Sequence, residues 1–351
     1  MKLRRFLTLA MVLSLAAGLS ACGGKATTPS DSAAGQRESA SESKADESTT
    51  AESKENEEVE GTPISLTTPV DCNLGTMTIH SEWLQFDKPY VVEDIFSPRI
   101  AAVGDYLIVL TDDKNVGKYK RDGGTLVLED SWTLDKNYEI LSQGPDNTFF
   151  LSGFMSPMIQ MDLEGKKLAQ YEDTDKATMY PDGKTGLVTW YGSTPEKLTL
   201  SDTNATREPV SSLEGYTAGD AGVSRAHMFL FGSAPNSDAK KVFVLDENNN
   251  VALALGGEES LKDDTLGAPQ GILETDQYYV VLDGNLRKLA LWDKEGNFAG
   301  KIDDGDLFGT RYPWICTATI AEDGTMYIGM TEGREEENSK DEFLVFTVSG
   351  F

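Results

Sequence analysis

Histidine and cysteine are scarce in this chain of 351 residues, with two copies of the first and three of the second. A Ser-His-Asp catalytic arrangement needs a histidine held by a carboxylate, and neither His80 nor His227 lies in such a motif. Each is interpreted as a structural or surface residue. Zinc is disfavoured because no clustered His or Cys ligands occur. Basic residues are also few, 31 against 58 acidic ones, which gives a formal net charge of −27. Nucleic acid is therefore excluded as a partner, because its phosphates would be repelled.

Long apolar runs are also missing, with one exception near the N-terminus. Lys2, Arg4 and Arg5 precede an apolar run over residues 6–19. A charged start followed by a short apolar core is typical of a secretory signal peptide. The run is shorter than the roughly 20 residues that a comfortable membrane span needs. Small residues follow it and lead directly to Cys22.

The sequence of residues 19–22, Leu-Ser-Ala-Cys, resembles the lipobox of bacterial lipoproteins. This resemblance implies that residues 1–21 are a signal peptide removed by cleavage before Cys22. It also implies a diacylglyceryl thioether, carrying acyl chains such as palmitate, on the Cys22 sulfur. The mature protein would then be anchored in the lipid bilayer at the extracytoplasmic face of the cell membrane. An ordinary signal peptide and a short membrane helix are the alternatives.

Residues 22–62 are rich in Ser, Thr, Ala, Glu and Lys and contain almost no large apolar side chain. Such a segment cannot bury enough surface to offset its ordering entropy. We expect a disordered acidic tether, whose root-mean-square reach is about 35 Å for some forty residues. Subtracting the charge of the signal (+3) and of the tether (−6) from the total leaves −24 for residues 63–351.

Residues 63–351 show a recurring unit of short β-rich runs bounded by Gly, Asp and Asn turns, which is typical of strands in tight hairpins. The second run of each unit starts near residues 106, 148, 187, 228, 278 and 326. A period of this kind, about 40 to 50 residues, indicates the blades of a β-propeller. The predicted fold is all-β, a six-bladed β-propeller. A ring of five or seven blades and a pair of β-sandwiches are alternatives, and one helical turn is possible at residues 258–263.

The segments 104–110, 289–298 and 323–329 read Gly-Asp-Tyr-Leu-Ile-Val-Leu, Leu-Ala-Leu-Trp-Asp-Lys-Glu-Gly-Asn-Phe and Asp-Gly-Thr-Met-Tyr-Ile-Gly. They resemble the units of six-bladed propellers of the NHL-repeat kind, in which an Asp-Gly turn precedes a short apolar strand. The similarity extends over about residues 81–351. The third and fourth units depart from the pattern, because they lack the turn in which Asp is followed three residues later by Gly.

The last unit ends at the C-terminus with its third strand, so a strand from the N-terminal side is expected to complete it. Residues 77–80 and 89–93 are the two candidates. With Cys22 assigned to lipid, Cys72 and Cys316 remain. A disulfide is possible in an exported protein, but two unpaired thiols are favoured, since the two residues are expected on strands that are not adjacent.

The loops that lead into each innermost strand of a propeller crowd around one mouth of the central channel. We predict a ligand-binding mouth formed by Arg99, Tyr138, Tyr180, Asp220, Gln270, Arg311, Tyr312 and Trp314. Two arginines among aromatic side chains suit a carboxylate or a sugar ring, through bidentate hydrogen bonds and stacking. The alternative is that the arginines form structural ion pairs and that the aromatic rings pack between blades.

The predicted function is non-catalytic, the binding of a protein, a peptide or a glycan by a lipid-anchored propeller. The competing hypothesis is a propeller-type hydrolase or lyase with a metal at the channel mouth. No cofactor is indicated, although residues 246–250, Asp-Glu-Asn-Asn-Asn, place oxygen side chains as calcium loops do. That segment lacks the glycine and distal glutamate of an EF-hand, so a hairpin turn is the preferred interpretation. Residues 335–337 are three consecutive glutamates that could bind a cation weakly.

Overall fold

The computed structural model describes residues 62–92, 97–202, 204–225, 227–334 and 340–351. These residues belong to one compact unit, Glu60–Phe351. The lipobox-like segment with Cys22, the tether and the glutamates at 335–337 lie outside the described residues. Within the described ranges, no helix is long and apolar enough to cross a membrane.

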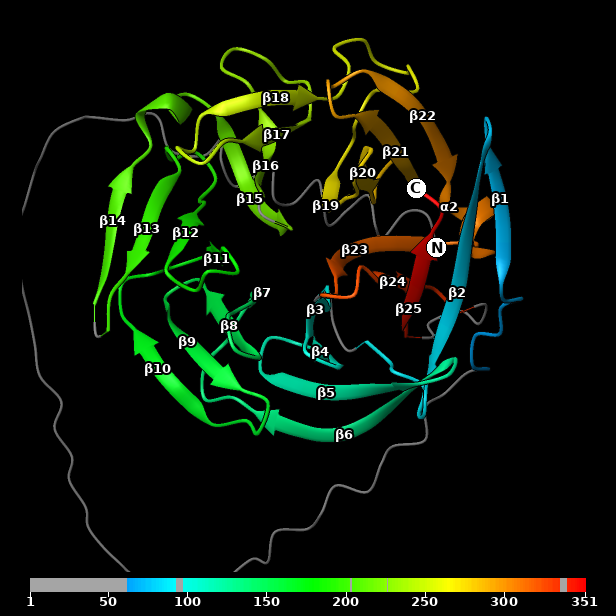
Figure 1. Ribbon diagram of the computed structural model, residues 1–351, viewed down its shortest axis with the longest axis horizontal. Coiled ribbons are helices and arrows are strands. Elements are labelled where there is room, and N and C mark those ends of the chain that lie inside the picture. Colours follow the sequence, from blue (N-terminus) through cyan, green and yellow to red (C-terminus); the bar gives the residue numbers. More distant parts are fainter. Residues whose placement is uncertain (1–61, 93–96, 203, 226, 335–339) are drawn as a thin grey trace, which may run out of the picture. The chain divides into compact units, whose positions relative to one another are not determined.

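The described part of the chain is almost entirely β-structure, arranged in sheets of antiparallel hairpins (Figure 1). Four sheets have four strands each. They are β7 (Ile140–Gln143), β8 (Thr148–Gly153), β9 (Ser156–Asp162) and β10 (Lys167–Tyr171); β11 (Ala177–Met179), β12 (Thr185–Val188), β13 (Glu196–Leu200) and β14 (Ala205–Pro209); β15 (Thr217–Ser224), β16 (His227–Ser233), β17 (Lys241–Leu245) and β18 (Val251–Leu255); and β19 (Pro269–Glu274), β20 (Tyr278–Asp283), β21 (Lys288–Asp293) and β22 (Phe298–Asp303).

A larger, nine-stranded sheet contains both ends of the described chain. Its strands are β1 (Val70–Leu74), β2 (Met77–Phe86), β3 (Arg99–Val103), β4 (Tyr106–Leu110), β5 (Asn115–Asp122), β6 (Thr125–Thr133), β23 (Pro313–Ile320), β24 (Met326–Glu332) and β25 (Glu342–Ser349). Strands β3 to β6 form one group of four, and β23, β24, β25 and β2 form another. In the sheet, the two groups are joined by the parallel pairing of β2 with β6, at Gln85 opposite Thr125 and Phe86 opposite Leu126.

The innermost strands follow one another around a central channel. Strand β3 contacts β7, β7 contacts β11, and the series continues through β15 and β19 to β23, which contacts β3 again. Figure 1 shows this closed arrangement, with the outermost strands β6, β10, β14, β18 and β22 around its edge. The second strand of each group starts close to the position expected from the sequence period. The prediction of an all-β propeller architecture is confirmed.

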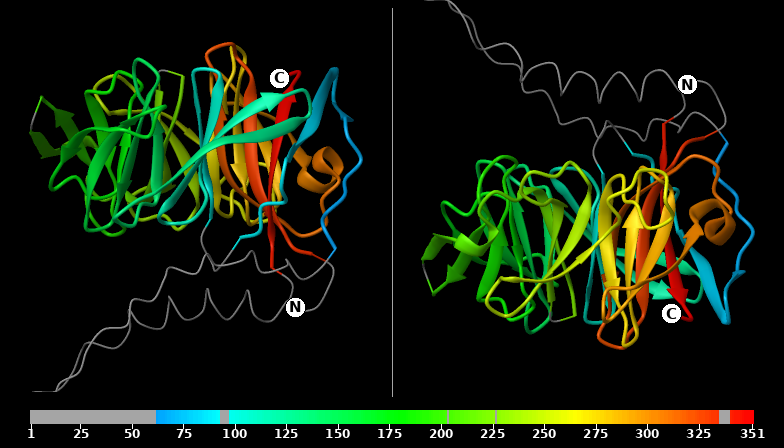
Figure 2. Two further views of the ribbon diagram at one scale, coloured as in Figure 1. Left: turned by 90° about the horizontal axis from the view of Figure 1, so that it is seen from below. Right: turned by 90° about the horizontal axis from the view of Figure 1, so that it is seen from above.

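The closing strand comes from the N-terminal side, as expected. Strand β2 pairs antiparallel with β25, and Trp83 lies opposite Phe346. The choice between the two candidate segments is also settled by this pairing, because residues 77–80 lie in β2. The other segment makes only an isolated bridge, between Val91 and Glu342. The blue strand β2 beside the red strand β25 is visible in both views of Figure 2.

Several hairpin turns between third and fourth strands are stabilised by the same side-chain to backbone hydrogen bonds. In each of three sheets an aspartate carboxylate accepts backbone N–H groups two and four residues further on. The aspartates are Asp162, Asp246 and Asp293. The tight turn also needs a left-handed residue, supplied by Gly165 (φ 75°), Gly296 (φ 86°) and, in the fourth unit, Asn249 (φ 60°). Asparagine tolerates this conformation better than most residues, which explains why the fourth unit departs from the Asp-to-Gly pattern and still forms the same hairpin.

Helical structure is limited in the described residues to α2 (Asp304–Phe308) and a 3₁₀ turn, η1 (Ser211–Leu213). The possible helical turn at residues 258–263 was wrong, because that segment contains only turns and bends. Apolar side chains fill the spaces between neighbouring sheets. One such cluster joins Phe231, Val242 and Trp292 between the β15–β18 and β19–β22 sheets. Each sheet therefore buries both faces against its neighbours.

Candidate functional site

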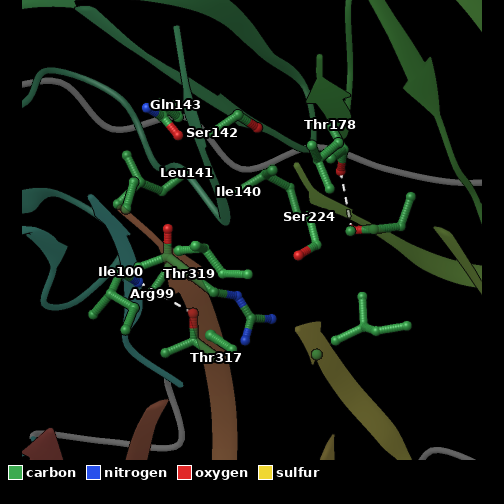
Figure 3. Close-up of a pocket in the computed structure, with 18 of the residues that line it drawn as sticks. Arg99, Ile100, Ile140, Leu141, Ser142, Gln143, Thr178, Ser224, Thr317 and Thr319 are labelled. Carbon is green, nitrogen blue, oxygen red and sulfur yellow. Dashed lines mark hydrogen bonds between the residues drawn. The ribbon is translucent and has the colours of Figure 1, made fainter. Parts of the chain in front are cut away.

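The central channel contains a cavity of about 490 Å³. Its walls are the innermost strands, and residues from β3, β7, β11, β15, β19 and β23 all contribute. Figure 3 shows that Arg99 and a set of hydroxyl side chains are gathered around this space. One edge of each innermost strand has no neighbouring strand. The N–H and C=O groups along that free edge therefore need other partners.

Serine and threonine hydroxyls on these strands supply those partners across the gaps between sheets. The hydrogen bonds are Ile100 N–H to Thr317 Oγ1 (3.2 Å), Ala102 N–H to Thr319 Oγ1 (3.2 Å), Met179 N–H to Ser142 Oγ (3.2 Å), Glu274 N–H to Ser224 Oγ (2.8 Å) and Thr178 O–H to the Ala221 carbonyl (3.2 Å). Each bond links one innermost strand to the next. These hydroxyls therefore hold the ring together at the channel wall, at about 1 kcal/mol for each bond.

Arg99, the first residue of β3, extends into the channel and is held by groups from several strands. Its Nη1 donates to the Cys316 carbonyl at 2.5 Å, and its Nε donates to the Glu139 carbonyl at 3.4 Å. Its Nη2 lies 3.7 Å from a carboxylate oxygen of Asp220, on β15 across the channel. The guanidinium is therefore occupied by protein groups and joins opposite walls of the ring.

Three neighbouring innermost strands pair irregularly. The register shifts in β15 between Ala218 and Asp220, at Gly219, in β19 on either side of Gln270, and in β23 on either side of Cys316. A bulge re-aims the side chain or carbonyl at that position. Gln270 and Cys316 are themselves the bulged residues, Asp220 directly follows the bulge, and all three line the channel cavity.

The structure brings Arg99, Asp220 and Gln270 together in the channel cavity, but it places the predicted aromatic residues elsewhere. Tyr138 is completely buried and packs with Phe149 between sheets, and burial raises the pKa of its phenol to about 12. Tyr180 follows β11 instead of preceding it, because β11 is only three residues long, and so lies at the opposite end of the channel. Both residues therefore follow the alternative prediction, in which the aromatic rings pack between blades.

Arg311, Tyr312 and Trp314 also lie outside the channel cavity. The backbone N–H groups of Arg311 and Tyr312 donate to the buried Glu332 carboxylate, at 3.1 and 2.8 Å. Trp314 packs against the cluster that contains Leu84 and Phe343. The predicted combination of two arginines and several rings at one mouth is therefore not assembled.

A different aromatic cluster is exposed at the end of the ring where β7 begins. Phe154 and Met155 form the turn between β8 and β9, and Trp190 and Tyr191 lie in the connection between β12 and β13. Their exposed fractions are 47%, 80%, 43% and 73%. The rings of Phe154 and Trp190 stack, with centroids 4.5 Å apart and planes inclined by 17°. We name these four residues the aromatic patch.

A pocket of about 400 Å³ adjoins the aromatic patch. Phe154 and Trp190 form one wall, and Arg207 is part of the other. Arg207 donates to Asp175 at 2.6 Å and, through Nε, to Glu196 at 2.6 Å, so both carboxylates are fixed at the pocket's edge. An exposed stacked pair beside fixed charged groups is unusual for a surface without a partner, since large apolar side chains in contact with one another mark interaction sites.

The aromatic patch was not predicted from the sequence. The available signal was the placement of two large apolar residues in each of two connections, at corresponding positions of neighbouring units. Such connections are normally polar. The hydroxyls of the channel wall gave no signal, because isolated Ser and Thr residues are common in strands.

Within the described ranges, no group of three or more His, Cys, Asp or Glu side chains is placed to hold a metal ion. The oxygen-rich segment at 246–250 is the hairpin turn described above, in which the Asp246 carboxylate bonds to backbone N–H groups. Cys72, on β1, and Cys316, on β23, are both free thiols.

No protein-family model and no curated protein sequence matches this chain. Solved β-propeller structures are similar to it. The β-propeller domain of Cps50 (Swd1) from Myceliophteria thermophila is 10% identical, with 79% of this chain and 99% of that chain covered and a TM-score of 0.46. Streptogramin B lyase is 8% identical, with coverage of 77% and 97% and a TM-score of 0.47. Regucalcin from Agrobacterium tumefaciens, a calcium-binding protein, is 10% identical, with coverage of 76% and 96% and a TM-score of 0.47.

Proposed function

We propose that this protein is a lipid-anchored, extracytoplasmic six-bladed β-propeller that binds a protein partner through the aromatic patch. The count of six treats the nine-stranded sheet as two blades that meet at the short parallel contact of β2 with β6. The anchor is Cys22, at the end of the lipobox-like segment. The role is binding and not catalysis.

The observation that carries this proposal is the contact of Phe154 with Trp190, flanked by the exposed Met155 and Tyr191. Phe, Met, Trp and Tyr are the residue types enriched at the centres of protein interfaces. Trp and Tyr are also frequent among the residues whose truncation costs most binding energy. Two connections of neighbouring sheets carry the four residues, and the stacking of Phe154 on Trp190 orders the centre of the patch before binding.

Charge around the aromatic patch indicates the chemistry of the partner. Asp175 and Glu196 lie at the adjoining pocket, and Asp173 is linked to it through a bond from Arg207 to its carbonyl. The domain as a whole carries −24 once the N-terminal segments are removed from the total. A partner with an apolar anchor flanked by Lys or Arg side chains would be electrostatically complementary.

The proposal is tested with the full chain immobilised against cell-envelope extract from the producing organism. The paired variant Trp190→Ser with Tyr191→Ser is compared with Leu128→Ser, whose exposed side chain lies on the separate strand β6. We expect one component to bind the wild type and the Leu128→Ser variant but not the paired variant, and protease treatment of the extract to abolish the binding. Loss after periodate oxidation but not after protease would show a glycan partner and overturn the proposal. Equal binding by all three chains would also overturn it.

The anchor is tested separately by metabolic labelling with a palmitate analogue. We expect label in the wild type and none in Cys22→Ser, which should leave the membrane fraction. Label retained by Cys22→Ser would contradict acylation at this residue.

A further inference from the structure

A second cavity, of about 750 Å³, lies at the opposite end of the ring from the aromatic patch. It is formed by the connection between β11 and β12, the turn between β15 and β16, and the turn between β17 and β18. We name it the hairpin pocket. Its volume lies in the range typical of sites for small organic molecules. Its lining includes three basic residues, Lys197, Arg225 and His227, and three acidic residues, Asp182, Asp246 and Glu247.

Two of the three acids are occupied by the turns that they stabilise. The Asp182 carboxylate accepts the N–H groups of Lys184 and Thr185, at 2.8 and 3.0 Å. The Asp246 carboxylate accepts two backbone N–H groups and the Asn250 amide, and these bonds lower the pKa of Asp246. The carboxylates of Asp182 and Asp246 are therefore already engaged with backbone N–H groups. The exposed Glu247 remains as an acceptor for a ligand's hydroxyl or ammonium group.

The basic residues, by contrast, retain hydrogen-bond donors that face the pocket. Lys197 is half-buried and has no ion-pair or hydrogen-bond partner among the described residues. Arg225 uses one nitrogen to contact Asp276, whose side chain is 88% exposed, so solvent screens that pair. The rest of the guanidinium fork is free to receive a planar oxyanion.

His227 is oriented for the same task by a buried carboxylate. Its Nδ1 lies 2.8 and 3.0 Å from the two oxygens of Glu274, which is 5% exposed and also pairs with Lys294 at 2.8 Å. A ring fixed through one nitrogen directs the other away from the carboxylate. The second nitrogen, Nε2, is therefore available to form a hydrogen bond with a ligand in the hairpin pocket.

Backbone geometry supports a role for Arg225 beyond the turn itself. Its φ is 51°, in the left-handed region that is unfavourable for a non-glycine residue. Glycine or asparagine would adopt this conformation at position 225 with less strain. The arginine also borders both the channel cavity and the hairpin pocket. Its guanidinium is thus placed where the channel opens toward the pocket.

From the convergence of these basic side chains, we propose that the hairpin pocket binds a small organic molecule through a phosphate or carboxylate group. Arg225 contacts the oxyanion with its guanidinium fork, and Lys197 adds a charge-assisted hydrogen bond. His227 and Glu247 form hydrogen bonds with hydroxyls of the same molecule. On a domain with a net charge of −24, Lys197 and the free side of the Arg225 guanidinium make the pocket a local site for an anion.

The test measures binding to the full chain by titration calorimetry with inorganic phosphate, glucose 6-phosphate, glucuronate and glucose. We expect glucose 6-phosphate or glucuronate to bind and glucose not to bind. Arg225→Gly, which suits the left-handed turn, and Lys197→Gln should each weaken binding at least tenfold. Arg121→Gln, which removes an exposed arginine paired with Glu82 on the far side of the ring, should bind as the wild type does.

The outcomes separate the two anion chemistries and decide the proposal. Binding of the phosphate ester but not of glucuronate assigns a phosphate head, and the reverse assigns a carboxylate. Absence of binding by every anionic probe overturns the proposal. Equal affinity in the wild type, Arg225→Gly and Lys197→Gln also overturns it, because an anion held elsewhere would not respond to these changes. Partner binding at the aromatic patch is independent of this result.

Discussion

Arg99 and Asp220 meet across the central channel, with a guanidinium nitrogen 3.7 Å from a carboxylate oxygen. They lie on β3 and β15, two innermost strands that are not neighbours in the ring. The arginine also donates to carbonyl groups of Cys316 and Glu139. One side chain thus links β3 to β15, to β23 and to the connection before β7.

The two residues are expected to contribute unequally to stability. Arg99→Ala should lower the free energy of unfolding by about 1 to 3 kcal/mol, because it leaves buried carbonyl groups without a donor. Asp220→Ala should cost less than about 1 kcal/mol, since the pair is long and partly exposed. Urea unfolding of both single variants and the double variant measures their coupling. A larger loss in Asp220→Ala than in Arg99→Ala would show that the ion pair, and not the carbonyl bonds, holds this end of the channel.

Asp283 fixes a loop at the start of its own sheet. Its fully buried carboxylate accepts N–H groups of Gly267 and Ala268 before β19 and of Asn285 and Leu286 after β20. Asp283→Ala should therefore destabilise the protein by about 2 to 4 kcal/mol, since four backbone donors lose one buried, charged acceptor.

Asp112→Ala is the matched control for Asp283→Ala. Asp112 makes similar bonds, to the N–H groups of Lys114 and Asn115, in an exposed turn where water can replace it. We expect a loss below about 1 kcal/mol. Thermal unfolding monitored by circular dichroism compares the two variants, and similar losses would contradict the special role of Asp283.

Glu332 should make stability depend on pH in a particular direction. Burial raises the pKa of Glu332, although the N–H groups of Tyr312 and Arg311 partly oppose the shift. The folded state therefore favours the protonated acid, and ionisation costs stability as pH rises from about 4.5, the ordinary value, through the raised one. Glu332→Gln keeps an acceptor oxygen and does not ionise.

The free energy of unfolding is measured in urea at pH 4 and pH 8. The stability of Glu332→Gln relative to the wild type should be higher at pH 8 than at pH 4. Glu129→Gln, on an exposed position of β6, should show no such gain. A difference between Glu332→Gln and the wild type that does not change with pH would contradict burial of the charged form.

The two thiols should differ in reactivity. Burial raises the pKa of Cys316 to about 12, so little thiolate forms at neutral pH and reagents cannot reach it. Cys72 is only partly buried, and burial together with Asp306 and Asp303 raises the pKa of its thiol. A maleimide should label Cys72 slowly in the native Cys22→Ser chain and Cys316 only in denaturant. Labelling of Cys316 in the native protein would contradict its place in the core.

Sequence periodicity was sufficient for the architecture because each hairpin carries its own local signal. Asp293 with Gly296 and the apolar runs of β4, β20 and β24 are visible without tertiary information. The closing strand could also be anticipated, because the last unit lacked a fourth strand. Residue 180 was misplaced because β11 has only three residues and gives too weak a pattern to locate its ends.

The candidate sites were less accessible to sequence reasoning because they depend on which loops meet in space. Gln270 lies at a bulge and Asp220 beside one, and no local pattern reveals either bulge. Trp190 and Phe154 stack only because two connections of neighbouring sheets lie side by side. His227 looked isolated in the sequence, and its partner Glu274 lies on the next sheet.

Photo-cross-linking from the aromatic patch tests the central claim most directly. A cross-linking amino acid is placed at position 191 of the full chain in the producing cell, and at position 128 as a control. The account predicts one defined polypeptide adduct from position 191, lost when Trp190→Ser is added, and none from position 128. The absence of an adduct at position 191, or an adduct that persists in the Trp190→Ser chain, would contradict it.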